Sequence, residues 1–256
     1  MELKIDFHTH TNRSIDGVSA FQEMVDAAKK AGIDGFSVTD HNICSTDITY
    51  NEKDILIIPG CEISTEEGHV LGVFLKENID VDNLWNGRLP SVAEAVQEVH
   101  NKGGITILAH PFEKAHSIIS KSHLANMVDG VETINARATF KNTKANEMAK
   151  EFAKKHNLPC FGGSDGHSNK EIGNGYTIVQ CEERTLESIE EAVRLGKTQP
   201  VMVKSTPRFR KGISQFHKAL RNQKKTRILK SIVYLAYCIG LDFYFSLLNI
   251  YDKLRD

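Results

Sequence analysis

The sequence predicts an α/β fold built from parallel βαβ units, and three observations support that prediction. Short apolar runs alternate with segments of helical periodicity along most of the chain, as they do in βαβ proteins. The 256 residues are enough for one large domain or two smaller ones. The composition, 40% hydrophobic and 25% charged, is that of an average soluble protein, which excludes collagen-like, disordered and disulfide-scaffold classes.

The predicted strands are short apolar runs that lie mostly in the first two thirds of the chain. In chain order they are Leu3–Phe7, Gly35–Thr39, Ile55–Ile58, Val70–Phe74, Ile105–Ala109, Gly130–Ile134, Pro159–Phe161 and Thr177–Val179.

The predicted helices are Ala20–Ala31, Val92–Lys102, Thr143–His156 and Leu186–Leu195. Gly32 and Asn157 are stop signals for the first and third helices. Ser91 stands three residues before Glu94, which predicts a capping box at the start of the second. The segment Gly196–Gly212 is interpreted as a linker.

Cysteine usage and the N-terminus predict a cytoplasmic protein. The five cysteines are odd in number and scattered, with no CxxC pair, which is typical of a reducing compartment. The first residues show no basic segment followed by an apolar run, so no signal peptide is expected. The C-terminal residues, first basic and then apolar, are also compatible with a protein that lies at the surface of a membrane.

Metal-type side chains follow several of the predicted strands. His8 and His10 come directly after the first strand, and the alternation of an extended chain turns both to the same side. The carboxyl ends of parallel strands are where a barrel collects its active site. Imidazole and carboxylate ligands without thiolates favour zinc, manganese or iron. The other groups at strand edges are Asp40-His41, Glu62, His69, His110 and Asp165-Gly166-His167.

These motifs, taken in order, resemble those of the PHP (polymerase and histidinol phosphatase) family. The resemblance covers about residues 1 to 205 and implies a distorted (β/α)7 TIM-like barrel, with two or three divalent ions (Mn, Fe or Zn) at its open end. The motifs are His8-Thr9-His10 with the turn Ser14-Ile15-Asp16-Gly17, Thr39-Asp40-His41, Gly60-Cys61-Glu62, Gly68-His69-Val70-Leu71-Gly72, Ala109-His110-Pro111 and Ser164-Asp165-Gly166-His167.

The resemblance also implies three sets of metal ligands that share one carboxylate. One ion would be held by His8, His10, Glu62 and Asp165. Glu62 would bridge to a second ion held by His69 and His110. A third ion would be held by Asp16, His41 and His167, and Asp16 stands where some members of the family have His.

The expected function is metal-dependent hydrolysis of a phosphoester, of the phosphatase or phosphodiesterase/exonuclease type. Closely spaced divalent ions provide a bridging hydroxide as nucleophile and clamp the phosphate oxygens, so a phosphomonoester, a nucleotide or a short oligonucleotide is the expected substrate. Asp40 is predicted to orient a ligand or to assist proton transfer. Arg137 is predicted to bind the phosphate bidentately.

Two other functions are alternatives. A catalytically silent PHP domain would serve as a metal-stabilised interaction module, and the complete ligand set argues against it. Metal-assisted hydrolysis of an amide, or deamination, on a similar barrel is weakened by the absence of an obvious bridging Lys.

Residues 206–256 are predicted to form a helical tail, first basic and then apolar, outside the domain of residues 1–205. Between Ala192 and Leu241 there are twelve Lys and Arg residues and no acid, whereas residues 1–191 carry 18 bases and 30 acids. Lys230, Asp242 and Gly240 interrupt the apolar segment, which favours two short helices over one membrane span. We expect these helices to pack on the barrel or to form a dimer contact. Binding of the basic run to an anionic membrane or to nucleic acid is the alternative.

Overall fold

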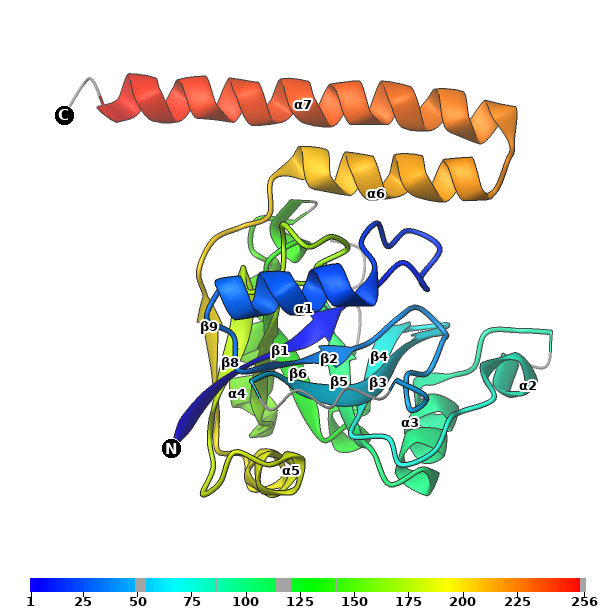
Figure 1. The fold of residues 1–256 in the computed structure, drawn as a ribbon, viewed down its shortest axis with the longest axis vertical. Helices are drawn as coiled ribbons and strands as arrows, with labels where there is room; N and C mark the ends of the chain where they lie inside the picture. Colours follow the sequence, from blue (N-terminus) through cyan, green and yellow to red (C-terminus); the bar gives the residue numbers. More distant parts are fainter. Residues whose placement is uncertain (49–53, 86, 114–120, 141, 254–256) are drawn as a thin grey trace.

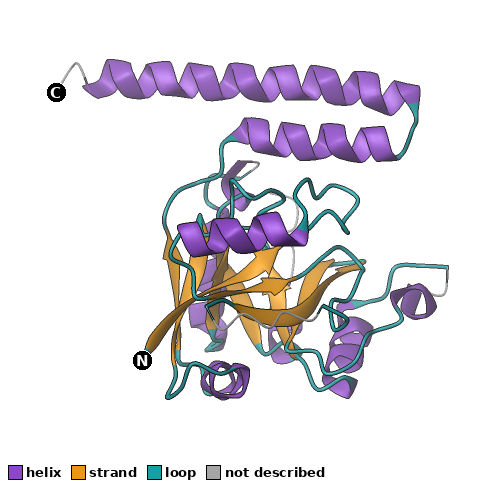
Figure 2. Ribbon diagram, viewed as in Figure 1, coloured by secondary structure: helices purple, strands orange, loops and turns teal. Residues whose placement is uncertain are grey.

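A nine-stranded sheet, curled into a nearly closed barrel, forms the body of the protein (Figures 1 and 2). The computed structural model describes residues 1–48, 54–85, 87–113, 121–140 and 142–253. The strands follow the order β7-β6-β5-β4-β3-β2-β1-β8-β9. Their bounds are β1 (Glu2–Thr9), β2 (Gly35–Val38), β3 (Leu56–Thr65), β4 (Gly68–Val73), β5 (Ile105–Ala109), β6 (Gly130–Asn135), β7 (Cys160–Gly163), β8 (Gly175–Gln180) and β9 (Thr198–Met202).

The barrel is mixed, so the predicted parallel units make up only part of it. Strands β1 to β3 are parallel to one another, as are β5 to β7. Strand β4 is antiparallel to both β3 and β5, and β8 is antiparallel to both β1 and β9. Only Glu66 and Glu67 separate β3 from β4, and so short a connection joins antiparallel neighbours, whereas a parallel crossover needs a dozen or more residues.

Two glycines of β7, Gly162 and Gly163, allow this strand to lie close to β8 and β1. The amide of Gly162 donates to Thr177 Oγ1 at 2.8 Å, and a Cβ at this glycine would lie 2.6 Å from the carbonyl oxygen of Tyr176. A Cβ at Gly163 would lie 2.5 Å from the Cβ of His8. Since no larger residue fits at either position, the Gly-Gly pair lets the two ends of the sheet approach each other. The predicted TIM-like α/β barrel is therefore confirmed, with nine strands in place of seven.

Apolar side chains fill the barrel and the spaces between the strands and the outer helices. Phe7 and Phe161 meet edge to face inside the barrel, with 5.4 Å between ring centroids. Around the outside lie α1 (Phe21–Lys30), α3 (Val92–Asn101), α4 (Ala145–His156) and α5 (Leu186–Arg194), which correspond to the four predicted helices. Ser91 and Glu94 form the predicted capping box, and Asn157 ends α4 in the left-handed conformation.

Three segments differ from the sequence-based expectations. Strand β3 runs beyond the predicted Ile58 to Thr65, because its second half pairs with β4 and so stays extended. Strand β9 lies inside the predicted linker Gly196–Gly212. Because β9 is the last strand in the sheet order, one of its edges makes no backbone hydrogen bonds to a further strand, so Pro200, which lacks an N–H donor, is tolerated there. The short helix α2 (Val81–Trp85) was not expected.

The C-terminal residues form a hairpin of two helices, α6 (Arg208–Arg221) and α7 (Lys225–Lys253). Helix α6 lies between the barrel and α7, and the two helices run side by side (Figure 1). The predicted division at residue 205 falls in the connection between β9 and α6, and the independence of the two parts as domains stays a prediction.

The expectation of two short apolar helices is wrong, because α7 is one continuous helix of 29 residues. Gly240 lies in its interior, where a glycine costs only about 1 kcal/mol relative to alanine, too little to interrupt a long apolar helix. The expected packing on the barrel is also wrong for most of α7. An 18-residue window within Lys225–Leu248 has a mean hydropathy of 1.6, and only 11% of that window is buried, so by length and composition this helix is able to cross a membrane.

Candidate metal centre

The structure brings the nine predicted metal ligands together at one end of the barrel. Each comes from a strand or from the loop that follows one, so the barrel itself sets their positions. His8 lies in β1, and His10 and Asp16 in the loop after it; His41 follows β2; Glu62 lies in β3 and His69 in β4; His110 follows β5; Asp165 and His167 follow β7.

Glu62 occupies the middle of this cluster and is fully buried. One carboxylate oxygen, Oε1, lies 2.7 Å from His69 Nδ1 and 3.2 Å from His110 Nε2. The other, Oε2, lies 2.6 Å from His41 Nδ1 and 3.4 Å from His10 Nε2. A carboxylate with imidazoles on both oxygens has the geometry that a bridging ligand between two cations requires.

His8, His10 and Asp165 form a group next to Glu62. Asp165 Oδ1 lies 3.3 Å from His10 Nε2 and 3.7 Å from His8 Nε2. One ligand atom from each of the three residues falls within 4.8 Å of the others, which is close enough for all three to reach one ion. Asp165 has a φ of 51°, so its backbone adopts the left-handed region that residues other than glycine rarely occupy and that is enriched at functional sites.

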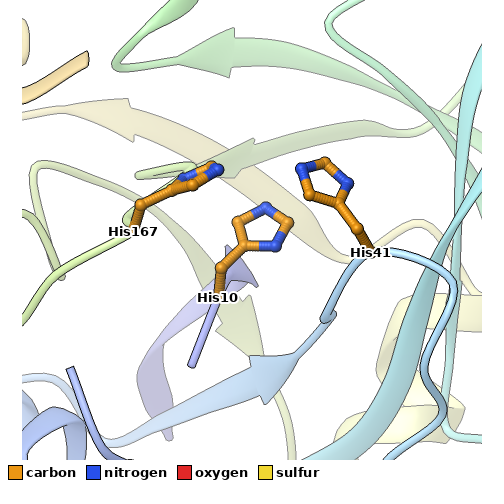
Figure 3. Close-up of side chains that lie close together, drawn as sticks. All are labelled: His10, His41 and His167. Carbon is orange, nitrogen blue, oxygen red and sulfur yellow. The ribbon is translucent and has the colours of Figure 1, made fainter. Parts of the chain in front are cut away.

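A second group joins His10 to His41 and His167 (Figure 3). The ring centroid of His10 lies 4.4 Å from that of His41 and 4.1 Å from that of His167. Asp16 Oδ1 is 3.7 Å from Nε2 of both His41 and His167. The other oxygen of Asp16 pairs with Lys218 Nζ of α6 at 3.0 Å, so a lysine shares this carboxylate with the imidazoles.

Neighbouring polar residues orient two of the histidines. Glu132 of β6 accepts a hydrogen bond from His8 Nδ1 at 3.0 Å and another from the amide of His110 at 2.8 Å. Such contacts fix the ring and tautomer of a metal-binding histidine. Sequence reasoning missed Glu132; an acidic residue in the middle of the predicted apolar strand Gly130–Ile134 was the available signal.

Asp40, predicted to orient a ligand or to move a proton, is fully buried among hydrogen-bond donors of the loop after β1. Its carboxylate accepts from Thr11 Oγ1 at 2.7 Å and from Ser14 Oγ at 2.8 Å. Ser14 Oγ in turn contacts His10 Nδ1 at 3.3 Å and accepts from the amide of His41 at 2.8 Å. This chain of contacts fits the orienting role, which stays a prediction.

Arg137, the predicted phosphate clamp, is buried, with only 4% of its surface exposed. Its Nε donates to Glu171 at 2.7 Å, and one terminal nitrogen donates to Ser214 of α6 at 3.3 Å. Bidentate binding of a phosphate would require the guanidinium to exchange these partners. Arg137 therefore ties α6 to the barrel in this structure, and phosphate binding stays a prediction.

Burial and close packing of opposite charges shift the pKa values of the cluster. Burial alone would raise the pKa of Glu62, but the imidazoles of His41 and His69 hold it well below its ordinary value. Burial would lower the pKa of His110, and the Glu62 carboxylate raises it instead to about 9. For His10 burial prevails and lowers the pKa, which favours the neutral imidazole that binds a metal.

Several buried ligand atoms have no hydrogen-bond partner among the described residues. They include Nε2 of His8, Nε2 of His10 and Oδ1 of Asp16. A buried polar atom left unpaired costs about 1–3 kcal/mol, and a divalent cation would satisfy all three atoms through their lone pairs. The donor set of imidazoles and carboxylates suits zinc, manganese or iron. The residues present therefore fit divalent ions.

A protein family and a relative from an archaeon match parts of this chain. The family described as PHP-associated matches residues 143–198. The uncharacterized protein MJ1587 of Methanocaldococcus jannaschii is 29% identical in an alignment of 170 residues, and the match covers 60% of this chain and 95% of that protein.

Two solved structures share the fold. One is a two-domain protein from Bacteroides vulgatus with a predicted PHP-like metal-dependent phosphoesterase (TM-score 0.59, 23% identity, 79% of this chain, 65% of that one). The other is the lesion-specific endonuclease EndoQ of Pyrococcus furiosus (TM-score 0.55, 16% identity, 78% of this chain, 58% of that one). This chain thus spans less than two thirds of either solved chain.

Proposed function

We propose that this chain, a member of the PHP family, is a metal-dependent phosphoester hydrolase. One observation carries the proposal: the buried Glu62 carboxylate lies between imidazoles on both of its oxygens, next to two histidine nitrogens that make no hydrogen bond within the described part of the chain. Phosphoester hydrolysis is the chemistry for which a cluster of two or three divalent ions is best suited.

One set of residues would hold the ions, and a second set orients these ligands. His8, His10, Glu62 and Asp165 would hold one ion, Glu62 with His69 and His110 a second, and Asp16 with His41 and His167 a third. Such ions supply Lewis acidity that activates a water and neutralises phosphate oxygens. Glu132 keeps the ring of His8 in place, and Asp40 supports His10 through Ser14.

The substrate is a phosphomonoester, a nucleotide or a short oligonucleotide that reaches the ions from the side of His69 and His41. The side chains of His69 and His41 are 33% and 19% exposed, whereas Asp16 and His167, on the side covered by α6, are at most 6% exposed. The likeness to EndoQ, a lesion-specific endonuclease, supports including nucleic acid among the candidates. We place the activity in the cytoplasm, where the unpaired cysteines stay reduced.

A catalytically silent, metal-stabilised module is the second candidate, and one contact favours it. The ammonium group of Lys218 lies 3.0 Å from Asp16 and supplies positive charge where a third cation would bind. A chain that has replaced one ion by a lysine would keep the fold of the metal centre without its full chemistry.

The test is a metal analysis combined with a screen of phosphomonoesters, nucleotides, oligonucleotides and amides. We expect hydrolysis of at least one phosphoester class with Mn, Fe or Zn added, and at least a roughly hundredfold loss of turnover in Asp165→Asn and in His10→Ala. His100→Gln is the matched control, because His100 is a half-exposed histidine paired with Asp129 outside the cluster. Metal-loaded protein inactive on every phosphoester would support the silent module, and activity on amides alone would overturn the proposal.

A further inference from the structure

Among the described residues, helix α7 contacts the rest of the protein along one stripe. Ser231 and Cys238 are buried on the side that faces α6, and a Cβ at Gly212 of α6 would lie 3.0 Å from the Cα of Leu235. Further along the same stripe, Asp242 accepts hydrogen bonds from the amides of Arg208 and Phe209 at 3.1 and 2.8 Å, which caps the first turn of α6. This stripe fixes which side of α7 is turned outward.

The opposite side of α7 is a continuous exposed apolar surface, which we call the outer face. Monomeric soluble proteins rarely expose apolar surface along an entire long helix, and such patches mark interaction sites. The outer face comprises Leu229, Ile232, Val233, Tyr237, Ile239, Phe243, Tyr244, Leu247, Leu248 and Ile250, each between 38% and 66% exposed.

A basic cleft of about 510 Å³ lies between α6 and α7, beside the outer face. Lys211 and Lys218 of α6 and Arg227 and Lys230 of α7 line it, and no acidic residue does. Lys211 and Lys218 pair with Glu113 and Asp16 of the barrel. Within the described part of the chain, no ion-pair partner lies near the exposed Arg227 and Lys230, so these two charges are available to an anionic ligand.

The two surfaces together match an anionic lipid bilayer better than other partners. A second copy of this chain would bring a like-charged cleft and helix, because residues 192–241 carry twelve bases and no acid. Nucleic acid would satisfy the bases but leave aliphatic side chains such as Leu229, Val233 and Leu247 in water. A bilayer with anionic headgroups offers acyl chains to the apolar side and phosphates to the bases.

We propose that the outer face of α7 lies in the interface of a membrane that contains anionic phospholipids, with the cleft bases at the headgroup phosphates. The helix would lie in the plane of the membrane, because its inner stripe stays packed on α6. Helix α6 is also tied to the barrel end that bears the candidate metal centre, through Lys218 to Asp16 and through Arg221 to the carbonyl oxygen of Ser14 at 2.6 Å. The candidate metal centre would therefore lie on the membrane side of the barrel.

Co-sedimentation of the full-length protein with vesicles tests this proposal. We expect binding to vesicles of phosphatidylcholine with phosphatidylglycerol, little binding to phosphatidylcholine alone, and weaker binding at high salt, since exposed charges are screened within about 10 Å at 0.1 M. The double variant Val233→Ser and Phe243→Ser should bind at least about tenfold more weakly, and so should Arg227→Ala with Lys230→Ala.

The matched control for charge is Lys154→Ala with Lys155→Ala, which removes two exposed bases from α4, on the body of the protein. It should bind vesicles as the unchanged protein does. Equal loss of binding in this control and in the Arg227 and Lys230 variant would overturn the role of the cleft. Vesicle binding that is unchanged by the outer-face substitutions would overturn the proposal as a whole.

A fluorescence measurement separates insertion into lipid from self-association. In Phe243→Trp, brominated acyl chains should quench the new tryptophan, whereas Trp85, the only native tryptophan, lies on α2 and should stay unquenched. A stable dimer that the outer-face substitutions dissociate, without vesicle binding, would assign this face to a second copy. Oligonucleotide binding that the α7 substitutions weaken, with no vesicle binding by the unchanged protein, would assign it to nucleic acid. Vesicle binding needs no metal, so its failure is distinguishable from failure of the proposed function.

Discussion

Glu62 and its neighbours show how single residues set the properties of the candidate metal centre. The carboxylate is buried among five histidines, and both of its oxygens contact imidazoles. Removing it would leave these rings without the anion that balances them, and would also remove the group shared by two predicted ions. For this reason Glu62 should matter more for metal content than a ligand that contacts one ion only.

Asp129 offers a test of side-chain energetics away from this centre. Burial alone would raise its pKa, but hydrogen bonds from Thr106 and His100 lower it. Because the pKa in the folded state lies below the ordinary value of 3.8, the folded state binds fewer protons, and the carboxylate stabilises the fold above pH 3.8. The contribution is lost as the pH falls through the lowered pKa.

Asp129→Asn should therefore destabilise the protein at pH 7 by about 1 kcal/mol. We expect no larger effect, because the Asp129 side chain is 39% exposed and solvent weakens its interactions. The difference from the unchanged protein should shrink below pH 3.8, because Asp129 of the unchanged protein then becomes protonated and loses its charge, whereas the asparagine of the variant is neutral at every pH. Urea unfolding at several pH values measures it. A pH-independent difference would show that packing, and not the charge, accounts for the loss.

Among the helices, the pair α6 and α7 depends on close approach at a single glycine. A Cβ at Gly212 would lie 2.8 Å from Leu235 Cδ1 and 3.0 Å from its Cα, so any side chain here pushes against the backbone of α7. Gly240 on α7 is the opposite case, because nothing lies within 4 Å of the position that its Cβ would take. The two glycines thus form a matched pair for substitution.

Gly212→Val should separate α7 from α6 and cost about 1–3 kcal/mol in the hairpin. The amides of Arg208 and Phe209, which donate to Asp242, should exchange with solvent at least about tenfold faster, while barrel amides stay protected. Hydrogen exchange followed by mass spectrometry reports both. Gly240→Ala should leave exchange unchanged or slow it, since alanine favours the helix by about 1 kcal/mol. Faster exchange in both variants would contradict the proposed role of close approach.

In the whole molecule, the stability of the barrel and its metal content should be coupled. The candidate ligands come from six strands of the sheet, β1 to β5 and β7, with their loops, so an ion bound by them connects distant segments of the chain. A ligand that binds only the folded state adds stability by mass action, about 2.7 kcal/mol at a concentration one hundred times its dissociation constant.

Removal of divalent ions by a chelator should therefore lower Tm, by about 5–10 °C for a protein of this size. Calorimetry with and without chelator measures the shift. Glu62→Ala should show a smaller shift and a lower metal content, because it removes the shared ligand. An identical metal content in Glu62→Ala and the unchanged protein would contradict the bridging role.

The order of strands and helices and the ligand motifs could be predicted from the sequence, because both are local. Alternating apolar runs and helical periodicity report which residues face the core, and His8, His10 and Asp165 stand directly at strand ends. The capping box at Ser91 is equally local. Such features depend only on residues that are close in the sequence, so they can be recognised before the fold is known.

The directions of the strands, the side-chain contacts across the barrel and the packing of the C-terminal helices depend on residues that lie far apart in the chain. Glu132 meets His8 across 124 residues, and Lys218 meets Asp16 across 202, which no local pattern encodes. The sequence favours two short helices here, whereas in the structure α7 is one helix that packs on α6 along one stripe and leaves its outer face uncovered. Burial is a property of the folded arrangement, since it depends on which surfaces long-range packing removes from water.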